Sequence, residues 1–112
     1  MDQINQYASI IKDGLTAYAA LLEKLPHAYE IVLVFDDERH QYLLRKIGWT
    51  ARERIDGIVL HVSIRQGKIW IEEDWTEEGL ATYLLAREVP AQDIVLGFVP
   101  PVERPYTEFA VA

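Results

Sequence analysis

Five carboxylates fall within seven residues in one acidic run of the chain, with no lysine or arginine among them: Glu72, Glu73, Asp74, Glu77 and Glu78. Oxygen ligands at this density could hold Mg²⁺ or Ca²⁺. The spacing does not match an EF-hand loop, however, and no glycine lies inside the run. Acidic residues are also favoured at helix starts, where they accept from free N–H groups and complement the helix dipole. We therefore interpret the run as a helix start, with Asp74 and Glu77 forming a capping box, and expect no metal site.

A basic segment precedes this run: residues 39–54 hold five basic residues against one acidic residue, a local charge of +4. Arginines around a tryptophan suit contact with phosphate together with stacking on a base. The same charges could instead keep a strand edge solvated or neutralise nearby carboxylates. Arginine and tryptophan also dominate contacts between proteins. A protein partner is the preferred interpretation and direct nucleic-acid binding is the alternative, with Arg45, Trp49, Arg52 and Arg54 as the candidate residues.

No set of residues matches a catalytic motif. The closest approach to a metal-dependent nuclease is Asp56 with Gln66 and Lys68. Gln66 lies in a predicted turn and Asp56 at the other end of the strand that leads into it. A strand rises about 3.3 Å per residue, so these residues are too far apart. His61 and Ser63 share a strand face, but nothing suggests a nucleophile elbow or an oxyanion hole. We expect no catalytic residue, no cofactor and a non-enzymatic role; a hydrolase or nuclease active only inside a complex is the weakest alternative.

Composition limits the class of protein. The chain has 112 residues, a formal net charge of −7, 50% hydrophobic residues and no cysteine. This length predicts a single domain over residues 1–112. The absence of cysteine excludes disulfides and thiolate metal sites and fits a cytoplasmic setting. We find neither a signal peptide nor an apolar stretch long enough to cross a bilayer. A negative charge of this size disfavours a surface devoted to DNA.

The periodicity of apolar residues predicts the elements that must position these side chains. Apolar residues at three- and four-residue steps predict an N-terminal amphipathic helix, capped by Asp2 and ended by Pro26. Leu60, Val62 and Ile64 are expected to share a strand face with Ile58. Short connections favour an antiparallel meander of four to five strands, covered by two helices, in an α+β fold of order α-β-β-β-β-α-β. The predicted elements are helices over 2–25 and 75–87 and strands over 30–35, 41–49, 54–64, 68–73 and 94–98.

Five short strings, in order, resemble one known family, the XisI family of fdxN-element excision controlling factors. The resemblance extends over nearly the whole chain. The strings are Val34-Phe35-Asp36-x-Glu38, Gly48-Trp49, Gly67-Lys68-Ile69-Trp70-Ile71, Asp74-x-Thr76-Glu77-Glu78-Gly79, and Gly97-Phe98-x-Pro100-Pro101-x-x-Arg104-x-x-Thr107-Glu108-Phe109-Ala110.

The resemblance implies a regulatory protein that accompanies a site-specific recombinase and a second accessory protein, XisH, during programmed excision of a DNA element. It brings no catalytic or metal-binding residue to this chain. Trp75 stands where many relatives are expected to carry a smaller residue. We expect partners to be an XisH-like protein and a recombinase. A homodimer is also expected, because two helices leave one sheet face uncovered. The full set of candidate partner-binding residues is Arg45, Trp49, Arg52, Arg54, Trp75, Glu77, Glu78 and Arg104.

Overall fold

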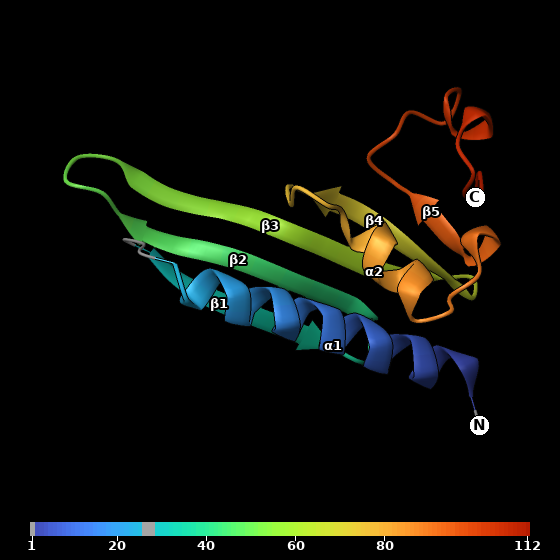
Figure 1. Cartoon of the computed structure of the whole chain (residues 1–112), viewed down its shortest axis with the longest axis horizontal. Coiled ribbons are helices and arrows are strands. Elements are labelled where there is room, and N and C mark those ends of the chain that lie inside the picture. The colour runs from blue at the N-terminus through green and yellow to red at the C-terminus, as the bar shows by residue number, and fades with distance from the viewer. Residues whose placement is uncertain (1, 26–28) are drawn as a thin grey trace.

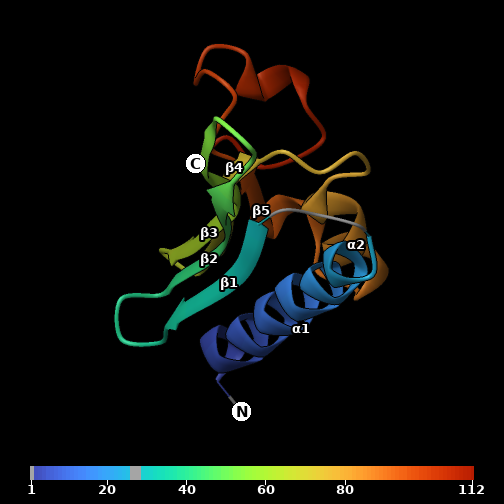
Figure 2. The same cartoon turned by 90° about the vertical axis from the view of Figure 1, so that its left-hand side faces the viewer.

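The computed structural model describes residues 2–25 and 29–112. Two helices lie on one face of a five-stranded sheet of order β1-β2-β3-β4-β5 (Figures 1 and 2). The helices are α1 (Gln3–Glu23) and α2 (Leu80–Ala86), the strands are β1 (Tyr29–Asp36), β2 (Gln41–Trp49), β3 (Arg54–Arg65), β4 (Lys68–Asp74) and β5 (Ile94–Leu96), and two short 3₁₀ turns span Ala91–Asp93 and Arg104–Tyr106.

The predicted α+β fold and its element order are confirmed. Strands β1 to β4 form the expected antiparallel meander. Strand β5 differs, since it pairs with β4 in parallel. The connection between β4 and β5 explains this difference. It contains α2, which packs on the sheet and carries the chain back to the starting end of β4, so β5 runs in the same direction as β4.

Helix α1 forms where its apolar stripe and its cap predict it. The Asp2 carboxylate accepts the Ile4 N–H at 3.1 Å and caps the first turn. Ile11 and Leu15 are fully buried against the sheet. Pro26, predicted to end this helix, lies outside the described residues. Leu25 belongs to the predicted stripe but follows the end of α1 and is 58% exposed.

The core lies between the two helices and the sheet, and a β-bulge shifts one of its predicted contributors. Leu44 pairs with Leu60, whereas Arg45 pairs with Ile58, so Val59 is the extra residue in β3. Val59 is accordingly buried in the core. The prediction that Ile58 shares a face with Leu60 is wrong, because the bulge reverses the alternation of side chains on one side of it. The fully buried side chains include Tyr42, Leu44, Leu60, Ile69, Ile71, Leu84 and Ile94.

The start of helix α2 also differs from the prediction. The sequence predicts a helix over 75–87, whereas α2 begins only at Leu80. Asp74 still caps it, but from six residues away: its carboxylate accepts the Leu80 N–H at 2.6 Å. The same carboxylate accepts the N–H and the hydroxyl of Thr76, at 2.9 and 2.6 Å. These bonds form a loop over residues 75–79 in place of a first helical turn, so the expected capping box with Glu77 does not form.

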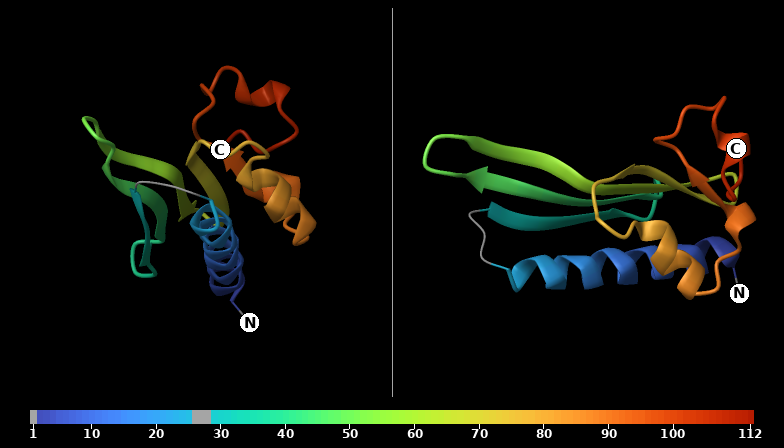
Figure 3. Two further views of the ribbon diagram at one scale, coloured as in Figure 1. Left: turned by 60° about the vertical axis from the view of Figure 1, so that its left-hand side comes forward. Right: turned by 45° about the horizontal axis from the view of Figure 1, so that its top comes forward.

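The C-terminal segment, residues 97–112, folds against the β4 end of the molecule (Figures 1 and 3). It contacts the sheet face opposite the helices, where the Arg104 guanidinium lies 5.2 Å from the centre of the Trp70 ring. The Ala110 N–H donates to the Ile94 carbonyl at 2.9 Å. Trp70 is half-buried, in agreement with the expectation that the C-terminal segment covers it. Among the described residues, no helix lies over the rest of that face, which spans β1 to β3 and which we call the open sheet face (Figure 2).

Alkaline pH is expected to destabilise the fold by ionising buried Tyr7. Burial, and then the bond to Asp93, raises the pKa of Tyr7 to about 12, and its hydroxyl donates to Asp93 at 2.5 Å. The tyrosine of the unfolded chain ionises first, near its ordinary pKa of 10.0. The contribution of Tyr7 to stability is therefore complete below that pH and is lost as pH rises towards the pKa of the folded state. Urea unfolding between about pH 8 and pH 11 should show this decline. Tyr7→Phe should lower stability at the acid end of that range and flatten the decline; an unchanged slope would contradict the assignment.

Candidate functional site

Three of the predicted partner-binding residues meet at the end of the β2–β3 hairpin, which projects beyond the other strands (Figure 1). Trp49 pairs with Arg54 across the hairpin, and the Arg54 guanidinium lies 5.5 Å from the centre of the Trp49 ring. The Thr50 hydroxyl accepts the Glu53 N–H at 2.9 Å and tightens the turn that carries Arg52. Trp49 is 59% exposed. We call Trp49, Arg52 and Arg54 the hairpin tip.

Outside the hairpin tip, two residues of the basic segment pair with carboxylates and a third lies over an aromatic ring. Arg45 pairs with Asp56 at 2.6 Å. Arg39 pairs with Asp36 at 3.1 Å. Lys46 lies over the Tyr29 ring, 5.6 Å from its centre. The carboxylates of Asp36 and Asp56 therefore offset two of the positive charges counted along the sequence, and the hairpin tip and Lys46 remain cationic.

The predicted acidic residues lie in a different place, on the loop that leads into α2. Trp75 is 74% exposed, and Glu77 and Glu78 are exposed beside it. The backbone of Trp75 is fixed, because its N–H donates to the carbonyl of the bulged Val59 at 2.9 Å. Its indole N–H donates to Glu73 at 2.6 Å. We call residues 75–79 the acidic loop; it presents an apolar side chain between carboxylates.

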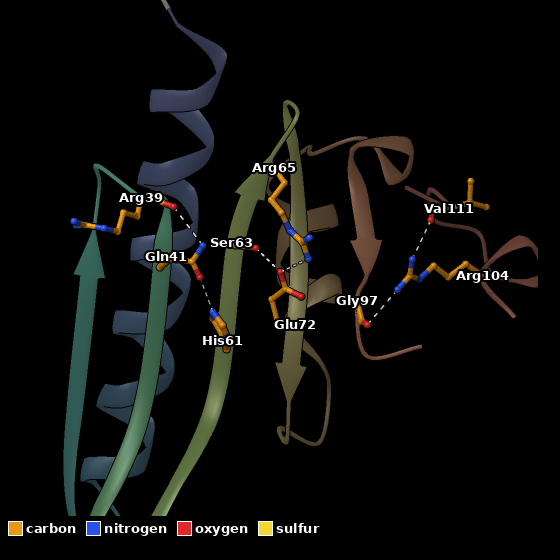
Figure 4. A network of polar contacts seen from close by, with 9 residues as sticks. All are labelled: Arg39, Gln41, His61, Ser63, Arg65, Glu72, Gly97, Arg104 and Val111. Carbon is orange, nitrogen blue, oxygen red and sulfur yellow. Dashed lines mark hydrogen bonds and ion pairs between the residues drawn. The ribbon is translucent and has the colours of Figure 1, made fainter. Parts of the chain in front are cut away.

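Arg104, the last predicted residue, binds the C-terminal segment itself (Figure 4). Its guanidinium donates to the carbonyls of Val99 at 2.9 Å, Gly97 at 3.3 Å and Val111 at 3.3 Å. The predicted residues thus form no single site. They lie at the hairpin tip, on the acidic loop and, for Arg104, within the packing of the C-terminal segment, while Arg45 lies on the open sheet face.

Sequence reasoning missed a polar cluster on β3 and β4 (Figure 4). The Glu72 carboxylate accepts the Ser63 hydroxyl at 2.5 Å and the Arg65 guanidinium at 2.6 Å. Ser63 is 1% exposed, which leaves no approach for a substrate. His61 bonds to Gln41 at 2.7 Å, so it does not act on Ser63. The signal in the sequence was the alternation of His61, Ser63 and Arg65 along one strand face. In the structure these side chains form polar contacts between neighbouring strands, with Ser63 buried and Arg65 exposed.

Metal and membrane sites receive no support from the described parts of the chain. Across residues 2–25 and 29–112, no group of three or more His, Cys, Asp or Glu side chains could hold a metal ion. The acidic run therefore does not converge on one point there. Among the helices of these same residues, none is both long and apolar enough to span a membrane.

Fold and surfaces together define a class: a small α+β protein with two helices on one face of a mixed sheet and several separate polar or aromatic surfaces. The chain belongs to the XisI family, because the family described as XisI protein matches residues 1–111. No curated protein sequence matches the chain.

Two solved structures share this fold over their whole length. The first is a XisI-like protein from Anabaena variabilis ATCC 29413, with 36% identity and a TM-score of 0.91 over 97% of this chain and 99% of that one. The second is the fdxN element excision controlling factor XisI from the same organism, with 38% identity and a TM-score of 0.89 over 99% and 100% of the two chains.

Proposed function

We propose that this protein is a non-enzymatic regulator of the site-specific excision of a DNA element and that it acts by binding proteins. The observation that carries the proposal is the similarity to the fdxN element excision controlling factor, at 38% identity over essentially both whole chains. The proposed partners are an XisH-like protein and a site-specific recombinase, which would do the strand chemistry. The role places the protein in the cytoplasm, with the DNA, and a chain without cysteine suits that compartment.

Partial neutralisation of the basic segment supports protein partners over DNA. Nucleic-acid affinity comes largely from cations that displace counterions from phosphate. Here Arg39 and Arg45 are engaged by Asp36 and Asp56, in a chain with a net charge of −7. The exposed tryptophans, Trp49 and Trp75, are residues that contribute strongly to protein–protein binding.

The proposal is tested in the native host. Deleting the gene should change the frequency of DNA excision, measured by amplification across the excision junction, and the tagged full-length chain should recover the recombinase or an XisH-like protein. An unchanged excision frequency in the deletion strain, with neither protein recovered, would overturn the proposal.

Direct nucleic-acid binding remains the second candidate, because the hairpin tip keeps Arg52 and Arg54 exposed beside Trp49. An electrophoretic mobility assay at low salt separates the two candidates. Tight binding by the isolated protein, lost in Arg52→Ala with Arg54→Ala and retained in Lys24→Ala with Arg39→Ala, would favour this second function. A protein that acts only through protein partners should give no shift.

Self-association through the open sheet face is a further expectation of the proposal. Val32, Val34, Leu43 and Ile47 alternate with the core-facing residues of β1 and β2, and Val34 is 41% exposed. The charged side chains that β1 to β3 place on this face balance, with Glu30, Asp36 and Asp56 against Arg45, Arg54 and Arg65. A neutral, partly apolar face is where two copies of an acidic chain can meet with least repulsion.

Light scattering is expected to show a dimer of the wild-type chain. Val34→Asp should convert it to a monomer, because two carboxylates would be buried at the interface. Val102→Asp is the matched control, since Val102 is 79% exposed in the C-terminal segment. A monomeric wild-type mass would contradict the expectation.

A further inference from the structure

A cleft of about 530 Å³ opens on the helix side of the molecule, between α1, α2 and the acidic loop. Leu60 of the sheet and Ala17 of α1 are among the residues that line it. The two helices are in close contact at Gly14, where a Cβ would lie 2.9 Å from the Tyr83 ring. The cleft begins at this contact.

The acidic loop lines one side of this cleft, because the hydrogen bonds of Asp74 hold residues 75–79 in a loop and α2 begins only at Leu80. Asp74 bonds to Thr76 and to Leu80, and Gly79 at φ +85° turns the chain into the helix. If residues 75–79 formed a helical turn, α2 would instead begin five residues earlier. Pockets of several hundred Å³ are of the size that binds side chains or small ligands. The cleft is thus a consequence of the loop.

An exposed apolar ridge runs along α1 and continues just past its last residue, Glu23, beside the cleft. Ala17, Leu21 and Leu25 are exposed and follow one another at four-residue intervals. Leu21 and Leu25 are each 58% exposed. Trp75 lines a neighbouring hollow of about 570 Å³ that shares Tyr18 with the cleft. A ridge of i, i+4 residues next to a groove is the shape into which a second helix packs.

The charge around this surface is negative. Glu77 and Glu78 line the cleft, and Glu73 lines the hollow with Lys46. Within the described part of the chain, the side chains of Glu77 and Glu78 form no ion pair. Burial, followed by the charges of Asp74 and Glu77, raises the pKa of Tyr18, which agrees with a negative potential there.

The negative charge of this surface favours a cationic partner protein over a second copy of the chain. A second copy that docked through the same surface would place these carboxylates against its own Glu77 and Glu78. A partner with lysines or arginines beside an apolar stripe would meet them with opposite charge. We propose that the surface formed by the cleft, the ridge of Ala17, Leu21 and Leu25, and Trp75 is the docking site for a cationic amphipathic helix of a partner protein. The inference deepens the proposed function, on which it rests for the existence of such a partner.

A peptide probe tests the surface without knowledge of the natural partner. The probe is a synthetic amphipathic helix of roughly five turns, with leucines at i, i+3, i+4 and i+7 and flanking lysines. Titration into the ¹⁵N-labelled full-length chain should shift the amides of Ala17, Leu21 and residues 75–79. Glu77→Lys with Glu78→Lys should weaken binding roughly tenfold. Ala17→Trp, which fills the cleft, should also weaken it. Glu103→Lys with Glu108→Lys changes the charge equally at a distant site and should leave binding unchanged.

The same variants tested on the partner recovered from the host distinguish failure of the surface from failure of the function. Loss of that partner in Ala17→Trp and in the Glu77/Glu78 variant, but not in the control, supports the inference. A partner retained equally by all variants overturns the docking site and leaves the proposed function standing. Peptide shifts confined to other residues, or equal binding by the variants, also overturn it. Peptide binding at the cleft without any native partner would support the surface and count against the function.

Discussion

Replacing Leu84 with alanine is expected to lower the free energy of unfolding by about 2–5 kcal/mol, the range for a fully buried leucine. Helix α2 has only seven residues, and its buried side chains are Leu80 and Leu84. Leu84 is 0% exposed. A helix of this length has little intrinsic stability, so its position depends on these contacts. Since small domains have only about 5–15 kcal/mol of stability, the loss is a large fraction of the total.

Leu85→Ala provides the matched control, because Leu85 is the neighbouring residue of the same helix and is 38% exposed. It should cost less than about 1 kcal/mol. Urea unfolding of both variants, with unchanged m-values, is the measurement. Equal losses would show that the cost comes from helix propensity and would contradict the packing role of Leu84.

Replacing Arg104 with alanine is expected to release the C-terminal segment, at a cost of about 2 kcal/mol. One side chain here donates to the three carbonyls of Gly97, Val99 and Val111 and lies over the Trp70 ring. Amide hydrogen exchange should accelerate at Gly97 and Ala110, whose N–H groups donate to Ile71 and Ile94. Exchange in β2 and β3 should be unchanged.

Arg104→Lys separates geometry from charge. Lysine retains a positive charge near Trp70, but it lacks the planar guanidinium that donates to the three carbonyls at once. It should therefore restore only a small part of the protection at Gly97 and Ala110. If Arg104 serves mainly to bind a partner, Arg104→Ala should instead weaken partner capture without changing hydrogen exchange.

Elements governed by short-range rules were predictable from the sequence. Helix α1 follows from a 3.6-residue apolar period and from a cap at Asp2, both of which involve residues within a few positions of each other. The four antiparallel strands follow from alternation and short turns. The involvement of Asp74 in capping was also predictable, whereas its bond to Leu80 six residues away was not, because a standard capping box spans only three residues.

The candidate surfaces depended on long-range pairing. Residues 39–54 read as a basic block, but the bond from Arg45 to Asp56 exists only because β2 and β3 are paired in a particular register. Val59 enters the core through a bulge that alternation along one strand does not reveal. Arg104 belonged to a recognisable motif, yet its contact with Trp70 requires the C-terminal segment to lie on β4.

By itself, therefore, the sequence determined the family resemblance, the α+β class, the order of elements and the absence of a recognisable catalytic motif. Only the tertiary structure decided that β5 is parallel, that Arg45 pairs with Asp56, and that Ala17 and Leu21 lie beside Glu77 and Glu78 around one cleft. The physical reason is the range of the interactions. Periodicity and capping act between near neighbours, while register, ion pairing and helix packing join residues far apart in the chain.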